Sequence, residues 1–170
     1  MKGDLHDISA MLTILVVDDN EGIRRGVKDL LDARPGWQVV GEAANGCEAL
    51  EKATRLVPEV VILDISMPEL DGISAVPLIR QALPQVELLV LSQHELPGMV
   101  ARALDAGVRG YVLKSQASRD LLPAVEAASK HMPFFSREIA PAGPRTESGS
   151  GKQSAGRLDS AGPSKKILDS

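Results

Sequence analysis

The sequence predicts an α/β fold in which helices cover both faces of a doubly wound, five-stranded parallel sheet. Five short runs rich in Val, Ile and Leu recur at regular intervals, without alternation between apolar and polar residues. Such runs suit parallel strands that are buried on both faces. The stretches between the runs carry apolar residues at helical spacing. Because parallel strands need crossover connections, this alternation indicates one sheet with a helix after each strand.

The expected strands are residues 12–17, 37–41, 60–63, 88–91 and 111–113. Apolar residues at helical spacing follow the first strand (Ile23, Val27, Leu30 and Leu31) and the second strand (Ala49, Leu50, Ala53, Leu56 and Val57). A further stretch, residues 122–140, closes the domain. In doubly wound sheets, ligands bind outside the carboxyl ends of the strands, where the strand order reverses. Any chemistry is therefore expected at the strand ends.

The composition is that of a soluble globular protein: 44% of the 170 residues are hydrophobic, 25% are charged, and the net charge is −4. There is no basic excess to neutralise nucleic acid or anionic lipid, so direct DNA binding is not expected. The single cysteine, Cys47, excludes an intrachain disulfide and suits a reducing compartment. We found neither a secretory signal pattern nor an apolar stretch of about 20 residues that could span a bilayer. These observations predict a cytoplasmic protein without membrane contact.

Three segments are expected along the chain: an N-terminal extension over residues 1–11, a folded domain over 12–140, and a disordered tail over 141–170. Gly, Pro and Ser make up 14 of the last 30 residues, a composition that buries too little apolar surface to offset the entropy of ordering. Residues 149–154 resemble a phosphate-binding loop only superficially, because Gln153 follows Lys152 where Ser or Thr is required. Met11 directly precedes the first strand, so residues 1–10 are expected to be dispensable.

Polar residues follow four of the five expected strands. Asp18 and Asp19 end the first strand, Asp64 the third, Ser92 the fourth and Lys114 the fifth. Each has a simple structural alternative: the acidic pair and Ser92 could cap helices, and Lys114 could extend over apolar surface to water. Asp64 is harder to explain in this way, because it follows four apolar residues and would be poorly solvated.

Considered together, the three carboxylates would repel one another unless a cation lay among them. A hard divalent ion with oxygen ligands, most naturally Mg²⁺, removes this conflict. The same ion would neutralise charge on an incoming phosphoryl group while a carboxylate oxygen attacks phosphorus. Ser92 and Lys114 could then donate a hydroxyl and an ammonium hydrogen bond to phosphoryl oxygens.

Four sequence blocks, residues 15–20, 63–72, 90–92 and 106–114, resemble the signature blocks of two-component response-regulator receiver domains. A finer resemblance, to the NarL/FixJ-like subfamily, rests on residues 40–43, 106–111 and 122–140. This resemblance implies a flavodoxin-like sheet of order 2-1-3-4-5. It also implies a C-terminal helix-turn-helix DNA-binding domain, which is not found in the sequence after residue 140.

The resemblance assigns a role to each matching position. Asp64 is the expected phosphorylation site; Asp19 and Asp64 would bind Mg²⁺ directly, Asp18 through its water shell, and Ser66 through its backbone carbonyl. The expected switch residues are Ser92, Lys114 and Tyr111. The implied phosphoryl donor is a sensor histidine kinase or phosphotransfer protein, and such a domain is a phospho-acceptor rather than an enzyme.

Two prolines depart from the expected helices. Pro77 falls well inside the third helix, where it should remove a hydrogen bond and cause a kink. Pro123 would do the same to the fifth helix unless that helix begins near Asp120, which would place the proline in its first turn.

The sequence also has four alternative interpretations. A haloacid-dehalogenase-type phosphatase needs a second Asp two residues after its nucleophile, but Asn20 occupies that position relative to Asp18. A flavin-binding protein would need aromatic residues, which are only 2% of the chain, and a phosphate loop that Asp18 and Asp19 would repel. A receiver that docks without phosphorylation, or the receiver part of a DNA-binding regulator, also remains open.

The output is expected to leave through protein contacts. Ser92, Tyr111 and Lys114 border the fourth helix and fifth strand, so phosphorylation at Asp64 should repack the face formed by helix four, strand five and helix five. We expect this face to bind a partner protein or a second copy of the chain.

Overall fold

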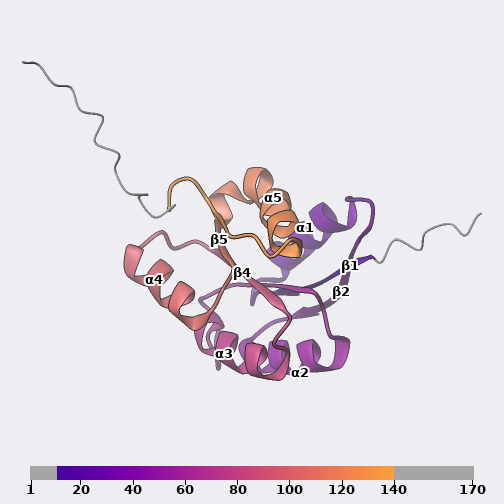
Figure 1. Cartoon of the computed structure of the whole chain (residues 1–170), viewed down its shortest axis with the longest axis horizontal. Helices are drawn as coiled ribbons and strands as arrows, with labels where there is room; N and C mark the ends of the chain where they lie inside the picture. Colours follow the sequence, from indigo (N-terminus) through magenta and orange to yellow (C-terminus); the bar gives the residue numbers. More distant parts are fainter. Residues whose placement is uncertain (1–10, 140–170) are drawn as a thin grey trace, which may run out of the picture.

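The computed structural model describes residues 11–139, and these form a single parallel sheet between two layers of helices (Figure 1). The expectations for residues 1–10 and for the tail after residue 140 lie outside the described residues. The order of the first five strands is 2-1-3-4-5, as predicted. They are β1 (Leu12–Val17), β2 (Trp37–Ala43), β3 (Val60–Leu63), β4 (Glu87–Ser92) and β5 (Gly110–Leu113).

The prediction of five strands was wrong by one, because β6 (Phe134–Phe135) pairs parallel with β5 at the edge of the sheet. A strand of two residues is too short to show any periodicity in the sequence. The segment is held further by Ser136, which is fully buried. Its N–H donates to the carbonyl of Tyr111, and its hydroxyl accepts from the Leu113 N–H and donates to Asp120.

The helices divide between the two faces. α1 (Glu21–Asp32) and α5 (Ala117–Ser129) cover one face, whereas α2 (Gly46–Leu56), α3 (Gly72–Ala82) and α4 (Pro97–Ala106) cover the other (Figure 1). Side chains of the central strands alternate between the two resulting cores: Leu15 and Val17 of β1 face α2, α3 and α4, and Ile14 and Val16 face α1 and α5. Burial on both faces explains the uninterrupted apolar runs. None of the helices in the described part of the chain has the length and apolar character needed to cross a membrane.

Both prolines lie inside helices on exposed positions. α3 continues from Gly72 to Ala82 through Pro77, and α5 begins at Ala117, so Pro123 falls beyond the first turn rather than within it. The two prolines lack the N–H groups that would donate to the carbonyls four residues earlier, those of Ile73 and Arg119.

Candidate metal and phosphate site

The register of the sheet aligns the strand ends that carry polar residues. Val17 pairs with Leu63 and Leu63 with Val90, so Asp18 and Asp64 follow neighbouring positions. Gly72 is required beside this edge, because a Cβ on it would lie 1.9 Å from the backbone oxygen of Asp64. The loop between β3 and α3 thus folds back tightly on the end of β3.

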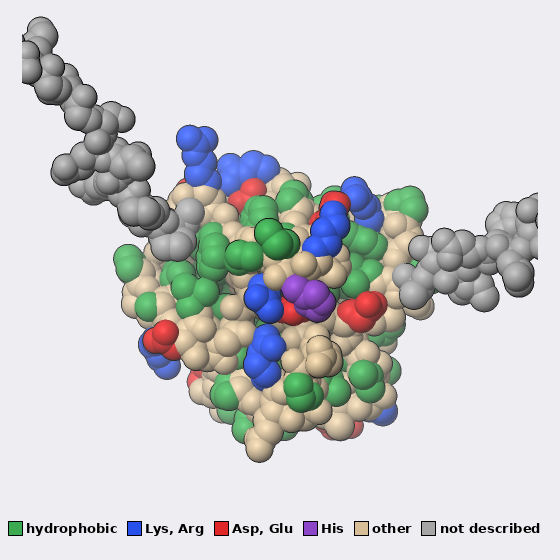
Figure 2. Space-filling view, in the orientation of Figure 1, with side chains coloured by type: hydrophobic (Ala, Val, Ile, Leu, Met, Phe, Trp, Pro, Cys, Tyr) green, Lys and Arg blue, Asp and Glu red, His purple; other side chains and the backbone are tan. Residues whose placement is uncertain are grey.

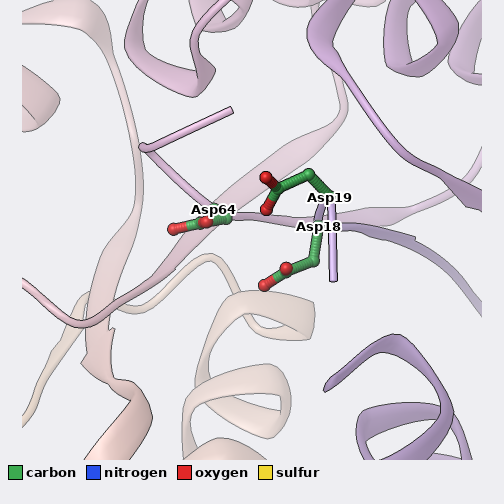
Figure 3. Close-up of side chains that lie close together, drawn as sticks. All are labelled: Asp18, Asp19 and Asp64. Carbon is green, nitrogen blue, oxygen red and sulfur yellow. The ribbon is translucent and has the colours of Figure 1, made fainter. Parts of the chain in front are cut away.

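Asp18, Asp19 and Asp64 form one carboxylate cluster (Figure 3). One carboxylate oxygen from each lies within 4.8 Å of the others. Asp18 and Asp64 are only 2% and 4% exposed, whereas Asp19 is exposed. The capping alternative is not supported, because Asn20 caps α1 by accepting from the Ile23 N–H. Neither carboxylate of the acidic pair is therefore the N-cap of α1.

Lys114 lies between two of these carboxylates. Its Nζ is 2.6 Å from Asp18 Oδ2 and 3.1 Å from Asp64 Oδ2. The contact with Asp18 is an ion pair without hydrogen-bond alignment, since Asp18 Oδ2 has no aligned donor. Because the Lys114 side chain is only 12% exposed, it does not extend into water as its structural alternative required.

The charges of the site are unbalanced. Burial raises the pKa of Asp64, although the Lys114 ammonium opposes the shift and the nearby Asp18 adds to it. Burial would lower the pKa of Lys114, but its contacts with Asp18 and Asp64 outweigh this effect and the pKa is raised. The cluster holds three carboxylates and one ammonium, which leaves two negative charges in excess. This excess and the all-oxygen donor set fit a divalent cation such as Mg²⁺.

A pocket of about 270 Å³ opens over the cluster. Acidic, basic and histidine side chains gather in a small central area of the molecular face seen in Figure 2. The pocket is lined by Asp19, Asn20, Ile23, Asp64, Ser66, Gln93, His94 and Lys114. Four of the seven sequence-predicted site residues thus face the pocket, and Asp18 lies beneath it against Lys114.

Ser92 and Tyr111 are fully buried behind the pocket. Ser92 does not cap α4, whose N-cap is Leu96, and its hydroxyl instead accepts from the His94 N–H. The Tyr111 hydroxyl donates to the His94 carbonyl at 2.7 Å, and burial raises its pKa. Ser92 and Tyr111, two of the three predicted switch residues, therefore contact the same short segment after β4.

His94 was not found by sequence reasoning. Its Nε2 lies 2.9 Å from Ser66 Oγ, so the imidazole joins the loop after β3 to the loop after β4 across the pocket. A lone histidine after a strand carries no motif of its own. The available signal was that His94 lies only two residues after Ser92, the last residue of β4.

A family model described as the response regulator receiver domain matches residues 14–126. The chain belongs to this family. Membership makes it a receiver domain of a two-component response regulator, and it excludes the phosphatase and flavin-binding alternatives. Receiver domains are signalling domains that work with histidine kinases and bind Mg²⁺ at an acidic pocket, and the three carboxylates here lie close enough together to hold a metal ion.

Relatives of this receiver domain include the response regulator protein VraR of Staphylococcus aureus, which is 38% identical over 128 residues. The match covers 75% of this chain and 61% of VraR, so the chain spans about three fifths of the length of the curated relatives it matches.

Similar solved structures are also response regulators. A LuxR-family two-component response regulator from Aurantimonas sp. has a TM-score of 0.74 at 34% identity, with 76% of this chain and 93% of that chain covered. The receiver domain of the response regulator NarL from Mycobacterium tuberculosis has a TM-score of 0.67 at 34% identity, with coverage of 71% and 97%. These relatives support the NarL/FixJ-like resemblance.

Proposed function

We propose that this receiver domain accepts a phosphoryl group on Asp64 and thereby switches a protein-interaction surface. The observation that carries the proposal is the placement of Asp64: a buried carboxylate at a strand end, 3.1 Å from an ammonium and within 4.8 Å of two more carboxylates. Lys114 pairs with Asp64 and Asp18 but not with Asp19, so a single ammonium faces three carboxylates.

Asp19, Asp64 and the backbone carbonyl of Ser66 would hold Mg²⁺ directly, and Asp18 would act through its water shell. When bound, the ion supplies positive charge beside the reacting phosphoryl oxygens. The Asp64 oxygen attacks phosphorus and forms a P–O bond, while the bond from phosphorus to the donor breaks and the donor leaves with that electron pair. Lys114 holds a phosphoryl oxygen as it does the carboxylates, and Ser92 donates its hydroxyl to another.

The donor proposed for this step is a sensor histidine kinase or phosphotransfer protein, and turnover ends by hydrolysis on the same domain. Ser92 and Tyr111 connect the site to the output surface, because both contact His94 at the start of the loop that leads to α4. Movement of Ser92 toward phosphate would pull this loop. The proposed output surface is the face of α4, β5 and α5, and its partner is another protein or a second copy of the chain. Leu96, the N-cap residue of α4, is 62% exposed.

Intact-mass measurement after incubation with acetyl phosphate and Mg²⁺ tests the acceptor. We expect one added phosphoryl group on the wild-type protein, none without Mg²⁺, and none on Asp64→Asn. A mass adduct that persists in Asp64→Asn would contradict the assignment.

Light scattering and backbone amide NMR with and without beryllofluoride test the output. The expected result is chemical-shift changes that reach Met99 and Tyr111, with or without dimerisation. Changes confined to the loops around Asp19 and Asp64 would instead favour a receiver that docks independently of phosphorylation.

A further inference from the structure

Arg24 stands out on α1 because its position opposes the helix dipole. It is the fourth residue of the helix, where a positive charge is disfavoured. Its side chain is nevertheless only 16% exposed. Burial of a cation near a helix N-terminus requires specific compensation. For Arg24 it comes from one hydrogen bond through Nη1 and an ion pair with Glu42, while the buried Nε makes no hydrogen bond to the described residues.

The guanidinium of Arg24 reaches back to the acidic pair. Nη1 donates to the backbone carbonyl of Asp18 at 2.7 Å, and Nε lies 3.4 Å from Glu42 Oε1 at the end of β2. Side chains in a helix point toward its N-terminus, so a long side chain one turn into α1 can reach the end of the preceding strand. Arg24 thus connects the peptide between Asp18 and Asp19 to β2.

That peptide is the main constraint on Asp19. The Asp18 side of it is fixed, because the Asp18 N–H donates to the Ala43 carbonyl and Asp18 Oδ1 accepts from the Asn20 N–H. By contrast, the Asp19 carboxylate makes no side-chain hydrogen bond or ion pair within residues 11–139. Its direction depends on the orientation of the peptide that precedes it.

We infer that Arg24 is a positioning residue for the cation site: it fixes the Asp18–Asp19 peptide and so aims the exposed Asp19 carboxylate at Asp64. This inference rests on the proposed function, because it concerns the same Mg²⁺ site. The inference predicts that loss of Arg24 changes the affinity for Mg²⁺ in the direction opposite to that expected from electrostatics alone. Removal of a nearby positive charge should tighten cation binding, whereas loss of a positioning contact should weaken it.

Isothermal titration calorimetry of the full chain with MgCl₂ alone measures whether the Kd for Mg²⁺ rises or falls. We expect the Kd for Mg²⁺ to rise about tenfold in Arg24→Gln, equivalent to about 1.4 kcal/mol. Arg24→Lys keeps one donor that can reach the Asp18 carbonyl, and its Kd should lie between those of Arg24→Gln and the wild type. Arg25→Gln is the matched control, because the neighbouring Arg25 makes only an exposed pair with Glu21 and should leave the Kd unchanged.

Glu42→Gln provides a second variant that leaves Arg24 in place. It should weaken Mg²⁺ binding less than Arg24→Gln does, and it should add nothing in the Arg24→Gln background. Thermal unfolding without Mg²⁺ identifies a purely structural role, which would lower the melting temperature of Arg24→Gln but leave its Kd equal to that of Arg25→Gln. An equal or tighter Kd overturns the inference. If the wild-type protein itself binds no Mg²⁺, the proposed function fails instead.

Discussion

Glu87 at the amino end of β4 and Asp64 at the carboxyl end of β3 are both buried carboxylates, but their surroundings differ. Arg109 donates two hydrogen bonds to Glu87, at 2.9 and 3.2 Å, and His131 Nδ1 lies 2.7 Å from it. Burial alone would raise the pKa of Glu87, yet these partners outweigh it and the pKa is lowered. At Asp64 burial prevails and the pKa is raised.

The comparison shows where the fold satisfies its buried charge and where it does not. At the amino end of the sheet, a carboxylate has its own partners and serves stability. At the carboxyl end, three carboxylates lie together and Lys114 pairs with only two of them, Asp18 and Asp64, which leaves negative charge that a cation or a phosphoryl group could use. Functional sites commonly carry such a cost in stability. Neutralising a buried carboxylate should therefore lower the free energy of unfolding at the amino end of the sheet and raise it at the carboxyl end.

The largest expected effect is that of Mg²⁺. At about one hundred times its Kd, Mg²⁺ should raise the free energy of unfolding by about 2.7 kcal/mol, because it binds only the folded carboxylate cluster. Denaturant titration with and without MgCl₂ measures this increase. Arg109→Ala, at the other end of the sheet, should keep the increase and Asp19→Ala should lose most of it. A full increase in Asp19→Ala would show that Asp19 is not a ligand.

Arg109→Ala should lower the free energy of unfolding by about 2 kcal/mol, because it leaves a buried carboxylate with one partner fewer. The value is below that for a fully buried pair, since Arg109 is itself partly exposed. Urea unfolding measures the loss, and Arg25→Ala, which breaks only a surface pair, is the control. Equal stabilities of the two variants would mean that Glu87 is solvated well enough without Arg109.

Asp64→Asn should raise stability by about 1 kcal/mol in the absence of Mg²⁺, since it removes a charge that the metal-free pocket disfavours. Glu87→Gln, the same isosteric change at the other end of the sheet, should lower stability. Thermal unfolding in EDTA measures both variants. If both changes have the same sign, the two ends of the sheet do not differ in the way described.

The smallest effect is the pH dependence of the Glu87 contribution. Since the folded pKa of Glu87 is lowered, its contribution is fully present above the ordinary carboxylate pKa of 4.5 and is lost as the pH falls through the folded pKa. The stability difference between the wild type and Glu87→Gln, about 1 kcal/mol at neutral pH, should therefore vanish at low pH. Acid titration of both proteins, followed by circular dichroism, checks this, and a difference that grows toward acid would refute it.

The sequence predicted most of the fold because each parallel strand is buried on both faces. Residues 12–17 and 60–63 were predicted with the bounds that the structure shows, and β4 and β5 within one residue at each end. β2 runs two residues further than expected, because Glu42 interrupts the apolar pattern while the strand continues to pair with β1. Hydrogen bonding rather than hydrophobicity sets this end.

The proximity of Asp18, Asp64 and Lys114 could be predicted because strand ends in such a sheet must meet at one edge. The connections of Arg24 and His94 could not be found in this way, since each depends on the direction of a side chain across a loop rather than on sequence position. Arg24 nevertheless carried one usable signal: a cation in the first turn of a helix that follows an acidic pair.

The short strand β6 determines where the C-terminal end of the domain can be truncated. β5 is buried along its whole length, and β6 with Ser136 occupies its outer edge. The family match ends at residue 126, before this segment begins. A chain cut at Ser129 would keep every helix and the entire cluster of acidic residues, yet it would expose an apolar strand with free backbone groups. Such edges pair with one another between molecules, so the shortened chain should aggregate although its site is complete.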